Sequence, residues 1–348
     1  TVELNAAVTS NRPVRALSGV RGAGAEFKNV SYSYLSENVI GCEELRMREE
    51  LAARGVCRVL CAGAQVSARA VKGGGDSALI DATAFVNALV ETEAGRAETF
   101  AAQLPLSLEA ALDERARGEA AAEIEVLGAE LYVQSEGLLC LELSLRVRVL
   151  DLCPREAALP ADAYVPGAAL ESAYGQAPLM LRGGRMQQRC SVDEKPSLPE
   201  GAPPPVRAVW CAARPLITCA GATGGMLCVE GLLFVRAMYE TGEGAVAAVS
   251  EQLPFACKMT CPAWCCAARV EAKVLLAGLA LSGGTLVLSA ALEISAAPYC
   301  EKNARFVAGF EEGAERGGRR SLILCYAGAQ ETLFDVGRRF GLSRAQLL

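Results

Sequence analysis

Four cysteines form the densest group of chemically reactive side chains in the sequence. Cys257, Cys261, Cys265 and Cys266 follow one another closely, and thiolates at short spacings are typical zinc ligands. The chain contains fifteen cysteines but no C-x-x-C pair, and it contains no histidine. The commonest metal ligand and the usual redox motif are therefore both missing. The cluster is either a metal site or a group of small apolar core residues.

The lack of histidine also bears on catalysis, because histidine is the commonest general base. A nucleophile would need a lysine or a carboxylate as its base, and no such pair stands in a recognisable catalytic motif. The glycines from Gly19 to Gly24 do not follow the G-x-G-x-x-G order. Residues 73–76 (GGGD) predict a hairpin turn rather than a phosphate-binding loop. We therefore expect no enzyme and no cofactor.

The composition indicates a folded protein with more than one core. The chain has 348 residues, of which 52% are hydrophobic, and a net charge of −6. This length suffices for two ordinary domains and a small additional module. Because the basic residues are scattered among acidic ones, no positive field is available to hold a phosphate backbone. We do not expect a nucleic-acid partner.

The N-terminal residues carry no export signal. Residues 1–15 show neither a basic start nor an apolar run, so we expect the protein to stay inside the cell with its cysteines reduced. The sequence lacks an initiator methionine and stops abruptly, which suggests that it is part of a longer protein.

The elements that must position any site are arranged as a duplication. Residues 85–92 (FVNALVET) resemble residues 234–241 (FVRAMYET), and a Gln-Leu-Pro triplet follows each block at the same distance. The offset is constant, since 234 − 85 and 254 − 105 both equal 149. A period of this length predicts two domains, each with its own core. The predicted core residues include Phe85, Leu104, Phe234 and Leu253.

The duplication also bears on the cysteine cluster. Subtracting 149 from its four positions gives Leu108, Leu112, Ala116 and Arg117. Three of these residues are apolar, which favours core packing over metal binding, and we expect no metal at the cluster. Further along, Ser135 aligns with Ser282 at an offset of 147. The sequence thus predicts that two residues are missing from a loop between the blocks.

Two stretches predict strand hairpins. Apolar residues alternate with mostly polar ones from Leu139 to Val149, which indicates a strand with one buried face. Residues 135–137 supply a turn to the preceding run, residues 124–133. In the second copy, residues 274–292 carry no charge over 19 positions (292 − 274 + 1), long enough for a transmembrane helix. Because the first copy is charged here and Ser-Gly-Gly interrupts the run, we expect a hairpin and no membrane span.

Composition shifts mark the domain boundaries. We place the first repeat at 27–152, a Pro-rich connecting segment with the start of the second repeat at 153–205, the second repeat at 206–299, a linker at 311–320 and a small module at 321–348. The prolines between Lys195 and Pro205 predict a surface loop. The charged, glycine-rich linker predicts a flexible tether.

The C-terminal module predicts a strand, a short loop and a helix. Residues 322–326 are strand-like; Thr332 is placed to cap a helix whose third residue, Asp335, reaches back, and Gly341 ends that helix. This pattern, together with residues 338–343 (RRFGLS), resembles the first half of a LysM domain. It departs from that family at residues 330–331, where a Gly-Asp pair usually precedes Thr-Leu, and it stops before the second helix and second strand.

The duplicated block resembles the SPOCS domain of spore-forming Firmicutes, through an apolar strand ending in Tyr239-Glu240, a glycine turn and residues 252–255 (QLPF). Tandem SPOCS domains followed by a LysM domain are found in spore-coat assembly proteins. The resemblance, over about residues 27–348, implies a mainly β fold with two tandem β-rich SPOCS-like domains and a truncated βα LysM-like module. It also implies a non-enzymatic assembly factor in the mother-cell cytoplasm, at the forespore surface, whose protein partner is the ATPase of the coat basement layer.

The C-terminal module supplies the candidate binding residues, which are Tyr326, Gln330, Glu331, Phe334, Arg338 and Arg339. We favour a protein-interaction scaffold in spore coat assembly; the alternative is LysM-type binding of peptidoglycan or chitin-like glycans at the loop 327–331. The two aromatic rings are also candidates for the core of the module. The two arginines suit a solvated helix face, and with Arg319 and Arg320 they would fit an acidic patch on a partner.

Overall fold

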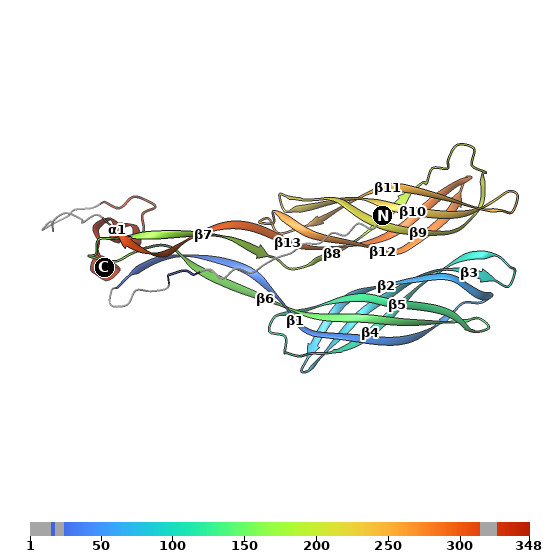
Figure 1. Ribbon diagram of the computed structural model, residues 1–348, viewed down its shortest axis with the longest axis horizontal. Helices are drawn as coiled ribbons and strands as arrows, with labels where there is room; N and C mark the ends of the chain where they lie inside the picture. Colours follow the sequence, from blue (N-terminus) through green and yellow to red (C-terminus); the bar gives the residue numbers. More distant parts are fainter. Residues whose placement is uncertain (1–14, 18–23, 314–325) are drawn as a thin grey trace. The chain divides into compact units, whose positions relative to one another are not determined.

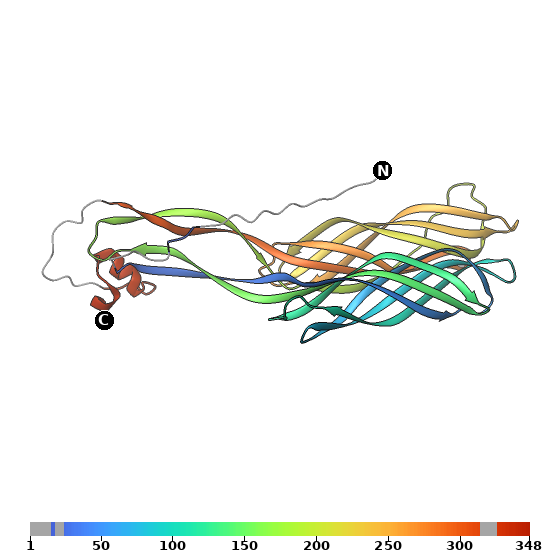
Figure 2. The ribbon, with the colours of Figure 1, turned by 60° about the horizontal axis from the view of Figure 1, so that its bottom comes forward.

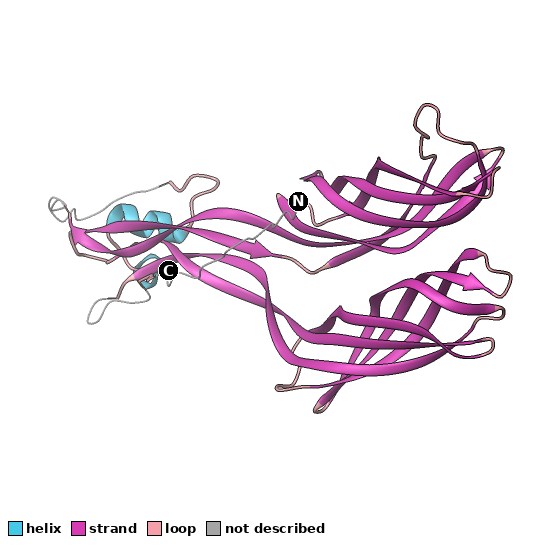
Figure 3. Ribbon diagram, turned by 45° about the vertical axis from the view of Figure 1, so that its right-hand side comes forward, coloured by secondary structure: helices cyan, strands magenta, loops and turns pink. Residues whose placement is uncertain are grey.

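The computed structural model describes residues 15–17, 24–313 and 326–348 of the chain. These residues form thirteen strands and two short helices (Figure 1), so the expected mainly β fold is confirmed. Both helices, drawn in cyan in Figure 3, lie near the C-terminus. The chain divides into two compact units; unit 1 is drawn from residues 1–34, 155–181 and 301–348, and unit 2 from residues 35–154 and 182–300.

The first six strands form two three-stranded sheets. One sheet has the order β1-β6-β5 and the other has the order β2-β3-β4, with antiparallel pairing of β5 to β6 and of β3 to both of its neighbours. We call this set copy 1. Its strands are β1 (Glu26–Ala52), β2 (Val56–Gly74), β3 (Ser77–Thr92), β4 (Ala97–Ala111), β5 (Glu119–Ser135) and β6 (Leu138–Tyr164).

The next seven strands repeat this arrangement, and we call them copy 2. One sheet has the order β11-β10-β9; in the other, β13 lies between β12 and the successive strands β7 and β8 (Figure 2). The pair β7 and β8 takes the place of the single strand β1. The strands are β7 (Leu170–Arg182), β8 (Met186–Glu194), β9 (Pro205–Thr223), β10 (Met226–Thr241), β11 (Val246–Thr260), β12 (Ala267–Ser282) and β13 (Thr285–Glu312).

The two copies share their strand registers. Phe85 of β3 lies opposite Gln103 of β4, and Phe234 of β10 lies opposite Gln252 of β11, as the offset of 149 requires. Four β-bulges also recur; the bulged residues are Cys57, Leu60, Arg69 and Leu127 in copy 1 and Val206, Val209, Thr218 and Leu275 in copy 2. Because a bulge is a defined local irregularity, recurrence at equivalent positions supports duplication of a whole folded unit.

Copy 2 is two residues shorter than copy 1 between the aligned blocks, which is why the offset falls from 149 to 147. The two missing residues lie at two places rather than in the single loop that the sequence suggested. One residue is lost between β11 and β12, where six residues connect the strands against seven in copy 1. The second difference lies inside a strand, since Gln134 of β5 is an extra bulged residue with no counterpart in β12. A bulge accommodates one inserted residue near the end of a strand. The sequence had predicted that such length differences occur only in loops.

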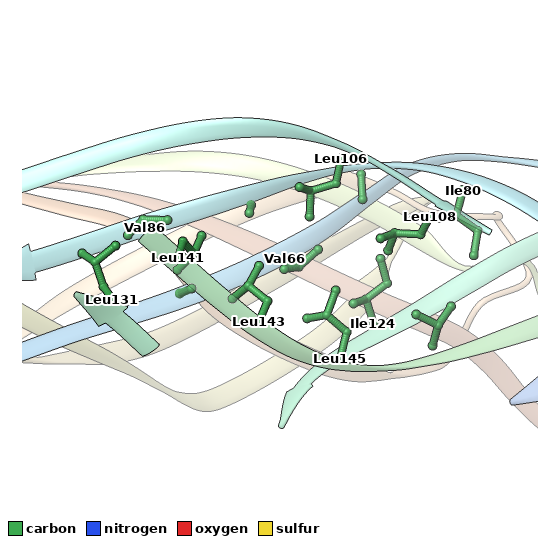
Figure 4. Packing of buried hydrophobic residues seen from close by; sticks show 14 of the residues in the cluster. Val66, Ile80, Val86, Leu106, Leu108, Ile124, Leu131, Leu141, Leu143 and Leu145 are labelled. Carbon is green, nitrogen blue, oxygen red and sulfur yellow. The ribbon is translucent and has the colours of Figure 1, made fainter. Parts of the chain in front are cut away.

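Each copy buries a core of its own between its two sheets. In copy 1, side chains from β6, such as Leu141, Leu143 and Leu145, point toward side chains such as Val66 and Val86 of the facing sheet (Figure 4). The predicted alternation from Leu139 to Val149 is confirmed on this inner face. Cys140 is the exception on the outer face, because it is buried and accepts a hydrogen bond from Arg48 at 2.9 Å.

The structure confirms some of the predicted core residues and contradicts others. Leu253 is buried, Leu104 is half-buried, and both pack with their core clusters. Phe85 is buried but lies outside the copy 1 core, on the outer face of its sheet between the inward residues Ala84 and Val86. Phe234 occupies the same outer face of copy 2 and is exposed, so its prediction as a core residue was wrong.

The uncharged stretch 274–292 forms the antiparallel hairpin of β12 and β13. Its turn is made by Gly283 and Gly284, which both have positive φ (58° and 78°), a conformation that favours glycine. Among the described residues, no helix is long and apolar enough to cross a membrane. The predicted loop 195–204 does connect β8 to β9.

Unit 1 joins the far ends of the long strands to the C-terminal helices, α1 (Leu333–Phe340) and α2 (Arg344–Leu347). The second helix was not expected from the sequence; it is a single turn begun by Ser343. The proposed linker starts inside β13, which ends at Glu312, and its residues from 314 onward lie outside the described residues. So do Arg319, Arg320 and residues 322–325 of the predicted strand.

The copies differ by a compensating change of size within one cross-strand pair. Ala82 lies opposite Leu106 in copy 1, whereas Gly231 lies opposite Phe255 at the equivalent place in copy 2. A Cβ atom on Gly231 would lie 2.5 Å from the Phe255 ring and 2.4 Å from the backbone oxygen of Leu216. The larger ring therefore requires the smaller partner.

We predict that Gly231→Ala lowers the free energy of unfolding by about 1–3 kcal/mol, because it overpacks this pair. Adding Phe255→Leu to the same chain recreates the copy 1 pair and recovers part of the loss. The reciprocal control in copy 1 is Leu106→Phe, which Ala82→Gly relieves. Denaturant unfolding of the single and double variants measures the coupling, and additive losses would contradict the size-complementary account.

Candidate interaction surfaces

Helix α1 begins as the sequence predicted. The Asp335 amide donates to the Thr332 hydroxyl at 3.4 Å, and the Asp335 carboxylate accepts from the Thr332 amide at 2.9 Å, which completes a capping box. Gly341 ends the helix in the left-handed region with φ 67°, again as predicted. The local sequence alone therefore fixes both ends of α1.

Asp335 also joins α1 to strand β1. Its carboxylate lies 3.0 Å from the Lys28 ammonium group. Hydrogen bonds from the Thr332 side chain and backbone, followed by that from Lys28, lower the pKa of Asp335 to about 2. The carboxylate is therefore ionised at every physiological pH and accepts all of these bonds at once.

Phe334, a candidate binding residue, lies in an internal contact. Its ring packs against Tyr164 of β6 in an edge-to-face arrangement with centroids 5.1 Å apart, and it is buried. The Tyr164 hydroxyl donates to the Leu342 carbonyl at 2.9 Å. A Cβ on Gly337 would lie 2.2 Å from that hydroxyl, so a glycine at this position lets the helix approach the strand. Phe334 thus serves the core of unit 1, one of the two roles considered for it.

Arg338 is partly solvated, as the sequence suggested, but its guanidinium is also engaged by the strands of unit 1. Its guanidinium forms a salt bridge with Asp162 of β6 and donates to the Tyr174 hydroxyl at 3.4 Å. That hydroxyl in turn donates to Asp162 at 2.7 Å, and Arg305 of β13 lies over the Tyr174 ring at 3.6 Å. The sequence could not reveal this network because Arg338 and Asp162 are 176 residues apart.

The remaining candidate residues lie on the surface of unit 1. Arg339 forms a salt bridge with Glu331, whose other oxygen accepts from the Gly328 amide at 3.1 Å and so holds the loop 327–331 in a turn. Gln330 is exposed, and Tyr326 is 86% exposed, which corrects its interpretation as a core residue. Of the six candidates, Phe334 is buried, Arg338 is half-buried and engaged by Asp162, and the other four lie at the surface.

A buried polar cluster in unit 2 was not detected from the sequence. The Ser67 hydroxyl of β2 donates to the Glu293 carboxylate of β13, and Arg189 of β8 donates to the same hydroxyl at 3.2 Å. Arg189 also lies over the Phe85 ring at 5.2 Å. Ser67, Arg189 and Glu293 border a cavity of about 220 Å³. The one available signal was Glu293, the first charged residue after the uncharged stretch 274–292.

This cluster joins the two copies. Ser67 and Glu293 are both almost fully buried, and the serine hydroxyl is engaged by a carboxylate and a guanidinium together. A charge in such a place is stabilised only when it is paired and hydrogen-bonded, as it is here. The arrangement can hold strands β2, β8 and β13 in one register.

A larger cavity of about 1160 Å³ in unit 2 is bordered by charges of both signs. Arg146 pairs with Glu44 and Glu125 at 2.9 and 3.0 Å, and Arg148 pairs with Glu123 at 2.7 Å. Ligand pockets are usually lined by apolar groups with a few convergent polar ones. Because these charged side chains already pair with one another, the cavity is a poor binding site for a small ligand.

The four clustered cysteines occupy two kinds of site. Cys257, Cys261 and Cys265 belong to the copy 2 core, whereas Cys266 is exposed. Burial and the neighbouring Cys261 thiol raise the pKa of Cys265, which opposes the thiolate form that zinc requires. Within the described part of the chain, no three His, Cys, Asp or Glu side chains are placed to hold a metal ion.

Comparisons with known proteins provide no family for this chain. No protein-family model, curated protein or solved structure matches it.

We predict that Thr332→Ala destabilises α1 by about 1 kcal/mol, since the helix loses its N-terminal cap. Hydrogen exchange of the α1 amides measures the effect. The control is Gln330→Ala, an exposed substitution two residues away, for which we expect unchanged exchange. Equal protection in the Thr332 variant and the wild type would show that the cap contributes nothing.

A second prediction concerns acid. Aspartate in an unfolded chain titrates near pH 3.9, so the lowered pKa of Asp335 stabilises the fold above about pH 4, and this stabilisation is lost as the pH falls through about 2. We expect the Asp335 carboxyl carbon, followed by NMR, to titrate near pH 2 in the wild type and well above it in Thr332→Ala. Titration near pH 4 in both proteins would contradict the assigned hydrogen bonds.

Proposed function

We propose that the chain is a non-enzymatic protein-interaction scaffold that takes part in spore coat assembly. The observation that carries this proposal is a rigidly held helix with exposed apolar groups beside it. Phe334, Asp335 and Arg338 anchor α1 to the strands of unit 1. Leu333 and Tyr326 remain exposed. A preorganised apolar surface binds a protein partner at low entropic cost.

The charges near α1 support a partner contact that is mainly apolar. Arg338 and Asp335 are already engaged by unit 1, and Arg339 by Glu331. A partner would have to compete with these existing pairs for the charged groups, whereas the Tyr326 and Leu333 side chains are available without such a loss. The proposed contact is therefore centred on the two exposed apolar residues rather than on the two arginines.

The resemblance of the sequence to SPOCS and LysM domains suggests where this scaffold acts. On that basis the partner is a protein of the coat basement layer, and the place is the forespore surface in the mother-cell cytoplasm. The duplicated strand registers and the cap of α1 are compatible with the proposed domain order. Because one fold can host many functions, the contact at α1 itself is what an experiment must test.

The second candidate function is binding of peptidoglycan or chitin-like glycans. The specific observation in its favour is the exposed Tyr326 ring next to the turn 327–331, with the exposed Gln330 amide in the same loop. Exposed rings stack on sugar faces and amides hydrogen-bond to hydroxyl groups. A glycan site would therefore depend on the loop, whereas a protein contact would also extend to the helix.

Two pull-downs with the full chain separate these functions. One uses lysate of sporulating cells of a spore-forming Firmicute, and the other uses purified cell wall. For the scaffold, we expect Leu333→Ala to lower recovery of the coat-layer partner about tenfold, with no retention on cell wall. The matched control is Val30→Ala, a similarly exposed apolar substitution on β1 of unit 1.

Retention on cell wall that Gln330→Ala abolishes, without a recovered protein, would overturn the scaffold proposal in favour of the glycan. A third variant, Arg339→Glu, reverses an exposed charge and leaves the Arg338 network intact. We expect a smaller effect from it than from Leu333→Ala. Reversal of Arg338 is unsuitable for this purpose, because it would place two carboxylates side by side at Asp162.

A further inference from the structure

Some apolar side chains of unit 2 are buried without belonging to either core, and four of them lie at β3, β9 and β12. These four are Phe85, Leu89, Val209 and Leu275. Phe85 and Leu89 lie on the outer face of β3, whereas Val209 and Leu275 are bulged residues of β9 and β12. Because each lies outside the space between its own two sheets, something other than its own copy covers it. That cover is the other copy.

Contacts between the copies confirm this interpretation. The Asn87 amide of β3 donates to the Ala277 carbonyl of β12 at 3.0 Å, and the Thr99 hydroxyl of β4 donates to the Val209 carbonyl at 2.8 Å. Strand β12 also lies against β2 and β3. We call the copy 1 side of this interface its front surface and the copy 2 side its back surface. The front surface is Phe85, Asn87 and Leu89, with Gln65 as the exposed cross-strand neighbour of Phe85. The back surface is Val209, Lys273 and Leu275, together with the Ala277 carbonyl.

Duplication means that each copy has both surfaces, but only one of each is used within the chain. The equivalent of Phe85 is Phe234, whose exposed fraction is 39% against 3%. The equivalents of Val209 and Leu275 are Leu60 and Leu127, exposed to 44% and 42% against 2% and 3%. The remaining equivalent, Met238, is half-buried beside its cross-strand neighbour Trp210. The chain thus leaves one front surface and one back surface uncovered.

The two uncovered surfaces are complementary in charge. On the front surface of copy 2, Arg214 and Arg236 replace the neutral Gln65 and Asn87 of copy 1. On the back surface of copy 1, Glu125 replaces Lys273, and it is already paired with Arg146 of β6 at 3.0 Å. Glu130 of β5 is exposed on the same strand. Exposed arginines on one surface and exposed carboxylates on the other favour this pairing and disfavour front-to-front contact.

We propose that the front surface of copy 2, around Phe234, binds the back surface of copy 1, around Leu60 and Leu127, in a second copy of this chain. The occupant is a second copy because the chain already contains the same interface internally, in which the bulged residues Val209 and Leu275 are the equivalents of Leu60 and Leu127. The contact is heterologous, since different surfaces meet, and each added chain leaves a free surface at either end. Head-to-tail association therefore follows.

This inference rests on the duplication and is independent of the proposed docking at α1, because none of its residues belongs to unit 1. It also explains why these bulged residues are leucines in copy 1 although their side chains are exposed. An exposed apolar pair at defined bulges is the kind of surface that marks a protein contact.

Sedimentation velocity of the full chain over a range of concentrations tests the proposal. We expect the wild type to self-associate, and we expect Phe234→Glu or Leu127→Glu to raise the dissociation constant at least about tenfold. The matched control is Leu79→Glu on β3, which alters an equally exposed leucine outside both uncovered surfaces. Thermal unfolding of each variant verifies that the fold is retained.

Mixing the two variants identifies the mode of association. Phe234→Glu retains an intact back surface and Leu127→Glu an intact front surface, so an equimolar mixture should form one-to-one dimers that do not grow further. A wild type that stays monomeric at all concentrations would overturn the proposal. So would association that survives both substitutions, or a mixture that stays monomeric while the wild type associates.

Discussion

Burial of one face of every strand is the constraint on which this structure depends. Aromatic residues make up only 5% of the chain, so the cores are built from leucine, valine and alanine at alternate positions of the strands. Small aliphatic side chains leave little tolerance for a change of size on one side alone. The exchange of Ala82 and Leu106 for Gly231 and Phe255 shows that the copies diverged by compensated steps within this limit.

The outer faces are free of that constraint, and there the copies differ in charge as well as in size. Gln65 and Asn87 correspond to two arginines, and the cross-strand pair Lys273 and Glu293 corresponds to Glu125 and Arg146 with reversed signs. The Glu125–Arg146 pair of copy 1 is partly exposed, and such pairs contribute little to stability. Glu293 of copy 2 is buried instead and takes part in the link between the copies, so the two positions differ in role as well as in sign.

Local features of the fold were predictable from the sequence, and distant contacts were not. Alternation in β6, the Gly283–Gly284 turn and the Thr332 cap depend on residues within a few positions of one another. By contrast, Arg338 meets Asp162 and Ser67 meets Glu293 across 176 and 226 residues. The hydrophobic periodicity of a sequence does not indicate which distant side chains come into contact. The wrong prediction for Phe234 has the same origin, because its burial depends on whether another copy covers an outer face.

The two anchoring networks fix different parts of the molecule. In unit 1 the pairs of Arg338 with Asp162 and of Asp335 with Lys28 fix α1 against strands, so the proposed partner would meet a surface that is already formed. In unit 2 the buried link of Ser67, Arg189 and Glu293 fixes one copy against the other. Because a buried charge left without its partner is costly, removal of any member would loosen the copies rather than merely weaken one bond. The surfaces at Leu60 and Phe234 are therefore presented on a unit whose two halves are held together from within.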